Sequence, residues 1–335
     1  MFKSINIRQI NMNKSKNAHS ELERLLFDKK KTIVLVQEPA LCRGKVLGLA
    51  NFKTEAISDK ARAAILISRD IDATPVAMFI DQDLVLCQIK TNNGGLLIGS
   101  VYCDILVKDF SLIDKAAKYA VKCDKKLVLG ADSNAWSTLW GDRSNARGRE
   151  LEETIVSNGL SIENKRQSIP TFEGGMGSSF IDLTLTHDMH DKIKNWSVVR
   201  SVDSDHNYIC YDVVEEVELK TKIAWGKTDW KGFRGDLDLV QWNLPPQWTA
   251  RTIDTLQQDI TTQVNKCFEK YAKRVPVSYF RDNNYWQDEQ TKAFIRKKTK
   301  AFRAYTQNPT EETKRAFQVS RDRLGNRIRK FKRER

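Results

Sequence analysis

Short runs of apolar residues, each about the length of a β-strand, dominate the first 214 residues. Some are continuous and rich in Val, Ile and Leu, which predicts buried strands. Others alternate between apolar and polar residues, which predicts strands with one buried face. The continuous runs are TIVLVQEP (32–39), ARAAILIS (61–68), DLVLCQIK (83–90), GLLIGSVY (95–102) and KLVLGADS (126–133), and the alternating runs lie at 5–12, 178–187 and 204–214.

Helical spacing of apolar residues occurs between only some of these runs, at about 17–29, 109–123 and 146–158. The last of these helices has Ser144 or Asn145 as its candidate N-cap. Strict alternation of strands and helices would need a helix after nearly every strand. The pattern therefore favours a sandwich of two sheets with a few helices over a single parallel sheet.

The pattern changes after residue 215. Residues 216–248 are rich in turns and aromatic side chains, and a helix is expected at 252–272. A hairpin of two basic helices follows. Its first helix covers about 285–306, and the second begins with Asn308 as cap, Pro309 at the first helical position and Glu311 closing a capping box.

These changes divide the chain into three parts. We expect a domain at 1–216, a connector with one helix at 217–284 and the basic helical hairpin at 285–335.

The net charge is concentrated in the C-terminal part. Residues 291–335 hold 16 Lys and Arg against 4 Asp and Glu, a net charge of +12, whereas the whole chain carries +13. A basic segment of this density indicates a polyanionic partner, most simply nucleic acid. A solvated helix face explains a charged run equally well, so the segment alone leaves both interpretations open.

Other features argue against several classes of protein. No apolar run approaches the roughly 20 residues that a membrane-spanning helix needs, so no membrane association is expected. The six cysteines are scattered and form no CxxC pair, which argues against a zinc site and a disulfide framework. We expect reduced thiols in an intracellular protein.

Several predicted strands begin or end with a polar residue. The set comprises Asn11, Glu38, Asp132, Asn134, Asp182, Asp205 and His206. Taken singly, Asp and Asn at strand ends cap turns, and a lone Asp-His pair is more often a surface feature than a catalytic one. Asp182 is different, because it interrupts an apolar run and a buried, unpaired carboxylate is costly. It needs a partner, and His206 is the candidate, since a carboxylate holds an imidazole in one tautomer.

This mixture of residues suits the cleavage of a phosphodiester. That reaction needs a divalent cation bound by oxygen atoms, a positioned water and a group that neutralises the phosphate. Mg²⁺ prefers one or two carboxylates together with water and phosphate oxygens. Glu38, with Asn11 and Asp205, is therefore the candidate ligand set, and Mn²⁺ is an alternative ion.

The remaining residues of the set match the other two requirements. Asp132, oriented by Asn134, is the candidate for activating the water. His206, held by Asp182, is the candidate for stabilising the non-bridging oxygens of the phosphate.

Six motifs, in this order, resemble the exonuclease–endonuclease–phosphatase superfamily. More narrowly, they resemble the endonuclease domain at the front of the polyproteins of non-LTR (LINE-type) retrotransposons. In DSNAWSTLWGDRSNARGRELEE (132–153), the Trp-Gly and the later Asn-Ala-Arg-Gly are typical of the jockey-like and insect site-specific clades. The motifs are INMN (10–13), VQEP (36–39), SVY (100–102), GADSNAWSTLWG (130–141), TF with SSFIDLTLT (171–186) and SDHN (204–207).

The resemblance implies an α/β fold. Two mainly antiparallel β-sheets flanked by helices would form a four-layer sandwich, followed here by the basic helical C-terminal extension. It also implies a divalent-metal-dependent DNA endonuclease that leaves a 3′-hydroxyl and a 5′-phosphate. In an intact retroelement that hydroxyl would prime reverse transcription. DNA is thus the expected partner, RNA is a further candidate for the basic helices, and a nuclear location would give access to chromosomal DNA.

Carried over residue by residue, the resemblance repeats the roles given above and adds four residues. Tyr102 would join the catalytic set and contact phosphate. Thr171 would also contact phosphate, and Ser204 and Arg147 would contact phosphate or DNA.

This chain departs from the family pattern in three places. Tyr102 is followed by CDIL, where the family often has prolines, so the next loop is expected to differ. Residues 173–179 are short and glycine-rich, where the family places a DNA-probing hairpin. No polymerase motif follows residue 290, so a chain derived from a retroelement would be a truncated or stand-alone copy.

Two other interpretations stay open. Another phosphoesterase of the same superfamily would use the same residues, although the context of Trp140-Gly141 and Arg147-Gly148 counts against it. A catalytically idle relic that binds nucleic acid through its basic tail would have the motifs without the activity.

Overall fold

The computed structural model describes residues 4–42, 45–46, 49, 52–56, 58, 60–91, 95–165, 168–175, 177–215, 221–276 and 289–333. The chain divides into two compact units. Met1–Glu218 together with Ser278–Arg335 form the first unit, and Leu219–Val277 form the second. Among the described helices, none combines the length and the apolar content needed to cross a membrane.

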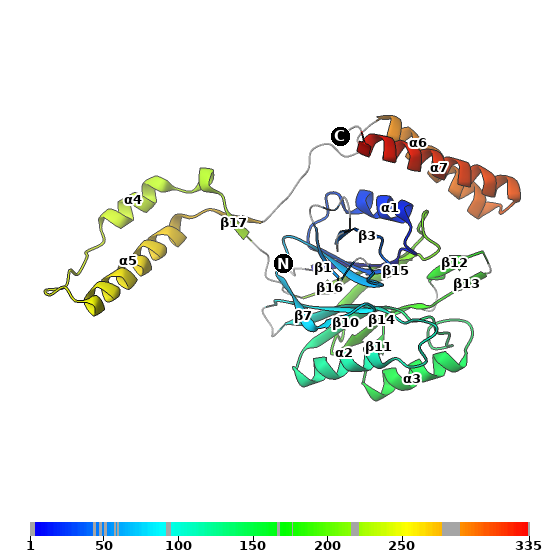
Figure 1. The fold of residues 1–335 in the computed structure, drawn as a ribbon, viewed down its shortest axis with the longest axis horizontal. Coiled ribbons are helices and arrows are strands. Elements are labelled where there is room, and N and C mark those ends of the chain that lie inside the picture. Colours follow the sequence, from blue (N-terminus) through cyan, green and yellow to red (C-terminus); the bar gives the residue numbers. More distant parts are fainter. Residues whose placement is uncertain are drawn as a thin grey trace. The chain divides into compact units, whose positions relative to one another are not determined.

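Two six-stranded sheets stack on each other in the first unit (Figure 1). In spatial order, the first sheet consists of β15 (Ile193–Val199), β16 (Tyr208–Val214), β1 (Ser4–Asn11), β2 (Thr32–Gln37), β6 (Ala63–Ser68) and β5 (Phe52–Glu55). The second consists of β11 (Ser161–Ile162), β14 (Asp182–His187), β10 (Lys126–Asp132), β9 (Leu96–Tyr102), β8 (Leu84–Ile89) and β7 (Ala73–Ile80).

The described strands of each sheet pair antiparallel except for one parallel pair. β1 and β2 are parallel and are joined by α1 (Lys16–Leu26), and β9 and β10 are parallel and are joined by α2 (Ser111–Lys122). A parallel pair needs such a crossover, because the chain must return to the end of the sheet from which it started. The prediction of two mainly antiparallel sheets flanked by helices is confirmed.

Helices cover the outer faces of both sheets (Figure 1). In the first sheet, Leu22 and Leu26 of α1 join one apolar cluster with Val34 and Val36 of β2. On the second sheet, α2 and α3 (Ala146–Ser157) supply the helical side chains of another cluster. All six residues of β2 are buried, which explains its continuous apolar run.

The two sheets approach each other closely at Gly130 on β10. A Cβ atom added there would lie 2.7 Å from side-chain atoms of Gln9 and Leu35 in the first sheet. Glycine at this position therefore allows the sheets to pack.

The helices of the first domain begin close to the predicted positions. Asn145, and not Ser144, caps α3, because its side chain accepts a hydrogen bond from the backbone N–H of Gly148. The strands β5, β7 and β15 were not predicted. All three lie at sheet edges and are partly exposed, so they lack a strong apolar pattern.

Short two-stranded sheets lie outside the sandwich. β3 (Leu41–Cys42) pairs with β4 (Lys45–Val46), and β12 (Phe172–Gly174) pairs with β13 (Gly177–Ser179). The second pair is a hairpin formed by the glycine-rich segment 173–179, although Met176 lies outside the described residues.

The C-terminal hairpin consists of α6 (Glu289–Gln307) and α7 (Glu311–Arg333). Thr310 and Thr313 exchange N–H···Oγ hydrogen bonds of 2.9 and 3.2 Å. Thr310 therefore caps α7, and the prediction of Asn308 as cap with Glu311 closing the box was wrong. Thr310 and Thr313 thus form the reciprocal pair of hydrogen bonds that was predicted for Asn308 and Glu311, two residues further along the chain. The predicted start of the hairpin at 285–288 lies outside the described residues.

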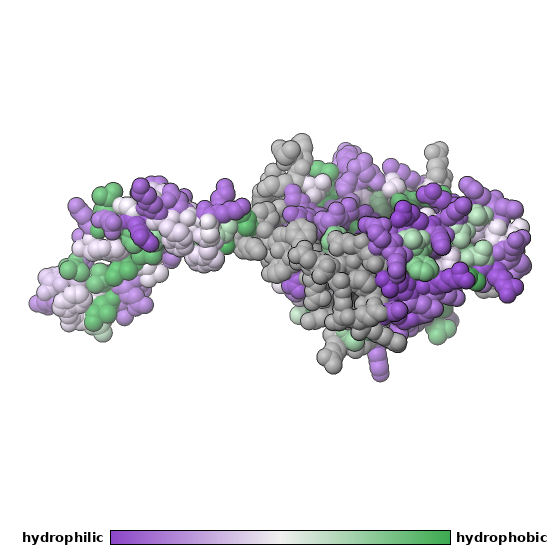
Figure 2. Space-filling model, turned by 90° about the horizontal axis from the view of Figure 1, so that it is seen from above, coloured by the Kyte–Doolittle hydropathy of each residue, from purple (hydrophilic) through white to green (hydrophobic). Residues whose placement is uncertain are grey.

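The second unit contains a helical pair and a small sheet. Its elements are β17 (Thr221–Ile223), the 3₁₀ turn η1 (Trp225–Lys227), α4 (Trp230–Asp238), α5 (Ala250–Tyr271) and β18 (Arg274–Pro276). The prediction at 252–272 corresponds to α5, whereas α4 was missed inside a segment that looked turn-rich. No residue of either helix is buried, and apolar side chains reach the surface of this unit (Figure 2).

Candidate active site

The four strands of the two parallel pairs finish with polar side chains. Asn11 ends β1, Glu38 directly follows β2, Tyr102 ends β9 and Asp132 ends β10. A hydrogen bond of 2.8 Å from Nδ2 of Asn11 to Oδ2 of Asp132 joins the two sheets at this end. The carboxyl ends of both pairs therefore meet at one end of the sandwich.

Two antiparallel neighbours begin at the same end. Asp182 opens β14 and lies opposite Asp132 in the ladder. His206 comes just before β16, whose residue Ile209 lies opposite Gln9 of β1. Strand direction thus brings Asp182 and His206 to the ends of β10 and β1.

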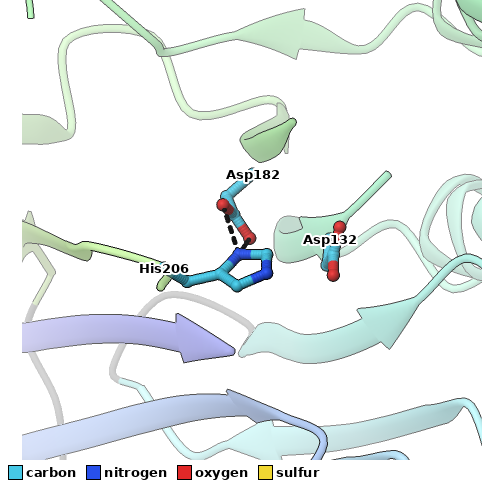
Figure 3. Close-up of side chains that lie close together, drawn as sticks. All are labelled: Asp132, Asp182 and His206. Atoms are coloured by element: carbon cyan, nitrogen blue, oxygen red, sulfur yellow. Dashed lines mark hydrogen bonds and ion pairs between the residues drawn. The ribbon is translucent and has the colours of Figure 1, made fainter. Parts of the chain in front are cut away.

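Asp182 and His206 form a buried pair (Figure 3). Nδ1 of His206 lies 2.9 and 3.1 Å from the two carboxylate oxygens, and the residues are 2% and 6% exposed. Burial by itself favours the neutral ring, but the charges of Asp182, Asp132 and Asp205 outweigh it and raise the pKa of His206 to about 9. At neutral pH the ring is therefore protonated, and its other nitrogen faces Asp132 (Figure 3).

Asp132 is 1% exposed and accepts hydrogen bonds on both oxygens. Oδ2 accepts from Asn11, and Oδ1 accepts from the backbone N–H of Asn134 at 3.3 Å. Burial and the charge of Asp182 raise the pKa of Asp132 to about 7. A carboxyl group that gains and loses a proton near neutral pH suits general acid–base chemistry.

Glu38 lies beside Asp132 and is half-buried. Nδ2 of Asn11 donates to Oε2 of Glu38 at 3.2 Å as well as to Asp132, so one amide bridges both carboxylates. The backbone of Glu38 is left-handed, with φ 44°, and its N–H donates to the carbonyl of Arg62 at 2.8 Å. This conformation is uncommon for a residue other than glycine.

Asp205 is attached to the same group through Asn13. Nδ2 of Asn13 lies 3.2 Å from Oδ2 of Asp205, and the backbone N–H of Asn13 donates to Oδ1 of Asn11 at 2.7 Å. The structure therefore brings the three predicted metal ligands into one hydrogen-bonded neighbourhood.

Thr171 and Ser204 support the backbone around the Asp-His pair. Thr171 is fully buried, and its hydroxyl oxygen accepts from the N–H of Asp182 at 3.0 Å. Ser204 donates to the carbonyl of Asn11 at 2.7 Å and accepts from the N–H of His206 at 3.2 Å. Their predicted contact with phosphate or DNA stays a prediction.

Arg147 and Asn134 connect the loops that follow β9 and β10. The guanidinium of Arg147 donates to the carbonyls of Ser133 and Asp104 at 3.3 and 3.0 Å. Nδ2 of Asn134 donates to the carbonyl of Cys103 at 3.2 Å. These bonds hold the two loops together, and contact of Arg147 with DNA stays a prediction.

Sequence reasoning missed Arg62. Its guanidinium lies 5.0 Å from the centre of the Tyr102 ring and pairs with Asp83 at 2.5 Å and with Asp104. Burial, followed by the charges of Glu38 and Asp132, raises the pKa of Tyr102 to about 12, so its hydroxyl keeps its proton at neutral pH. The only signal in the sequence was the CDIL departure after Tyr102, because it supplies Asp104.

The oxygen-rich set around Glu38 fits a hard divalent cation. The amide of Asn11 bridges carboxylates from the two sheets, and carboxylate and amide oxygens are the ligands that such a cation prefers. Asp132, Asp182 and His206 also offer ligand atoms within 4.8 Å of one another. The ligand set expected from the sequence, Glu38 with Asn11 and Asp205, stays a prediction.

Comparisons with known proteins agree with this geometry. The family described as "Endonuclease-reverse transcriptase" matches residues 96–210. The Pol polyprotein of the type-1 retrotransposable element R1 from Bradysia coprophila is 28% identical, over 58% of this chain and 22% of the relative. The probable RNA-directed DNA polymerase from transposon BS of Drosophila melanogaster is 27% identical, over 56% and 22%. The chain spans about a fifth of the length of these relatives.

Solved structures extend the likeness to the fold. The endonuclease domain of TRAS1, a telomere-specific non-LTR retrotransposon, has a TM-score of 0.56 and 28% identity, over 63% of this chain and 98% of that domain. The catalytic domain of Xenopus laevis APE2 has a TM-score of 0.52 at 14% identity, over 65% and 94%, and shares the fold alone. The resemblance to endonuclease domains of non-LTR retrotransposons is confirmed.

Proposed function

We propose that this chain, which has the fold and the sequence features of a non-LTR retrotransposon endonuclease, is a divalent-metal-dependent DNA endonuclease. One observation carries the proposal. Asn11, Glu38, Asp132, Asp182 and His206 come from five separate stretches of chain and converge at one end of the sandwich. An idle scaffold has no need to bury two carboxylates and an imidazole together, because their burial is costly.

The cation would be held by Glu38 with Asn11 and Asp205. When bound, Mg²⁺ would supply a Lewis acid that stabilises charge on the phosphate and on the leaving oxygen, and Mn²⁺ is the alternative ion.

The chain's own residues would handle the protons. Asp132, with its pKa near neutrality, would accept a proton from the attacking water, while Asn11 and Asn134 hold its carboxylate in place. The protonated ring of His206 would donate a hydrogen bond to a non-bridging oxygen, and Asp182 would keep the ring oriented and charged. Tyr102 keeps its hydroxyl proton at neutral pH and would donate a hydrogen bond to another phosphate oxygen.

The products follow from the resemblance. A nick that leaves a 3′-hydroxyl and a 5′-phosphate would serve target-primed reverse transcription in an intact element, and chromosomal DNA would be the substrate. RNA binding by the basic helices and a nuclear location belong to the same proposal.

A plasmid-nicking assay tests the function directly. We expect purified protein with Mg²⁺ to convert supercoiled plasmid to the nicked form, with 3′-hydroxyl ends detected by primer extension. His206→Ala should lower the nicking rate by about 10²- to 10⁴-fold. His190→Ala is the matched control, because it removes an exposed imidazole from a surface turn. Absence of nicking by the wild-type protein would contradict the proposal.

The idle relic is the second candidate, and the basic C-terminal segment favours it. It predicts DNA binding that weakens steeply with salt, without cleavage. The same preparation decides between the two, because only the endonuclease produces nicked circles.

A further inference from the structure

The loop that precedes β16 contacts two different parts of the first unit. On one side it carries Asp205 and His206 of the candidate site. On the other side Nζ of Lys298, on α6, donates to Oδ2 of Asp203 at 2.6 Å. The two side chains are 6% and 5% exposed. A buried ion pair therefore joins the C-terminal hairpin to the loop of the candidate site.

A second carboxylate, from Glu21 on α1, lies in the same junction. Its Oε2 accepts from the hydroxyl of Ser201 at 2.8 Å and from the N–H of Val202 at 3.3 Å. Burial and the charge of Asp203 raise the pKa of Glu21, whereas the charge of Lys298 lowers it. Two buried carboxylates thus share one ammonium group, and loss of that group would leave uncompensated buried charge.

Apolar side chains close the junction. Leu324 and Ile328 of α7 are buried and form a cluster with Phe294 and Ile295 of α6. A cavity of only about 20 Å³ remains between α1, the loop and the hairpin. A Cβ atom added to Gly325 would lie 3.2 Å from Oδ1 of Asn17 on α1. The hairpin is therefore packed on the domain and is not merely a solvated basic tail.

Hydrogen bonds lead from Asp203 to the candidate site. The carbonyl of Asp203 accepts from the hydroxyl of Ser15 at 3.1 Å, and the next residue, Ser204, bonds both Asn11 and His206. Oδ1 of Asp203 is buried and has no hydrogen-bond partner within the described ranges. The position of this carboxylate thus depends strongly on Lys298.

We propose that Lys298 is a positioning residue for the candidate site: its ion pair with Asp203 fixes the loop 201–206, so that cleavage requires the C-terminal hairpin to be packed on the domain. This inference rests on the proposed endonuclease function. Lys298 acts through Asp203 and Ser204 and does not contact the reacting groups.

Steady-state nicking by full-length variants tests the proposal. Lys298→Met keeps the aliphatic part of the side chain and removes the charge, and we expect kcat to fall about tenfold to a hundredfold. KM should change by less than about threefold, because the loss concerns positioning and not uniform substrate binding. Lys298→Arg should retain most of kcat. Lys300→Met removes the same charge from an exposed position of α6 and should leave kcat near the wild-type value.

Hydrogen exchange supplies a readout that does not depend on cleavage. The backbone amides of 201–207 should exchange about tenfold faster in Lys298→Met than in the wild type, and Lys300→Met should show no such change. If Lys298→Met does not fold, Asp203→Asn makes the same comparison from the side of the loop.

The outcomes separate the two proposals. An unchanged kcat together with unchanged exchange in Lys298→Met would overturn the inference while leaving the endonuclease intact. If the wild-type protein does not nick DNA, the proposed function fails, and exchange alone then decides whether the hairpin orders the loop.

Discussion

The two parallel strand pairs are built alike, yet they give the site different kinds of group. β1 and β2 finish with Asn11 and a half-buried Glu38, whereas β9 and β10 finish with Tyr102 and a fully buried Asp132. Burial next to Asp182 raises the pKa of Asp132 to about 7. The difference teaches that topology decides where a carboxylate lies, and that burial beside a second carboxylate sets the proton affinity of Asp132.

Exchanging the two carboxylates for amides gives the largest expected contrast. Asp132→Asn should lower kcat by about 10³-fold at every Mg²⁺ concentration, because the proton acceptor is lost. Glu38→Gln should raise the Mg²⁺ concentration needed for half-maximal nicking by about tenfold or more and recover activity at high Mg²⁺. Nicking rates measured across a Mg²⁺ titration check both. Equal responses of the two variants to Mg²⁺ would contradict the different roles proposed for Glu38 and Asp132.

Stability against pH gives a contrast of intermediate size. The pKa of His206 is raised from 6.5 to about 9, so the Asp182–His206 pair contributes fully below pH 6.5 and is lost as pH rises through 9. The raised pKa of Asp132 acts in the same direction at lower pH. We expect the unfolding free energy of metal-free protein to fall by up to about 3 kcal/mol over the His206 range. Denaturant titrations at several pH values measure it.

The matched variants for this measurement are His206→Gln and His190→Ala. The first should lose the slope between pH 6.5 and 9, and the second should keep it. The same slope in all three proteins would show that the pair does not titrate as described.

Removing one supporting hydroxyl gives the smallest effect. Thr171→Val leaves the N–H of Asp182 without its acceptor, so we expect a loss of about 1–2 kcal/mol in unfolding free energy and about tenfold in kcat. Thr186→Val removes another buried hydroxyl, which donates to Glu163 at 2.7 Å farther along β14. It should cost similar stability without lowering kcat. Thermal unfolding and nicking rates of both variants decide whether the support is local to the site.

The sandwich could be predicted from the sequence because its central strands are buried on both faces. The continuous apolar runs at β2 and β10 correspond to fully or almost fully buried strands. The edge strands β5, β7 and β15 were not predicted, because partly exposed strands have a weaker apolar pattern. β7 also contains Pro75. A proline is tolerated at a sheet edge, although it normally argues against a strand.

The residues of the candidate site could be recognised as polar residues at strand ends. A carboxylate inside an apolar run stands out because its burial is costly unless it has a partner. Their pairing depended on topology, which places Asp182 opposite Asp132 in the ladder. Arg62 was missed, since its contact with Tyr102 depends on the approach of two separate strands. Asp203 and Lys298 are 95 residues apart in the sequence. The C-terminal segment is rich in basic residues, and nothing in the sequence distinguishes the lysine that points into the protein.

At position 38 the left-handed backbone favours glycine, whereas the proposed function needs a carboxylate. Glycine adopts this conformation without steric conflict, whereas a side chain strains it. Glycine at position 38 would relieve that strain, whereas under the proposed function the carboxylate of Glu38 is needed to hold the cation. If the proposed function holds, loss of cleavage would remove the reason for a glutamate here, and position 38 would be free to become glycine.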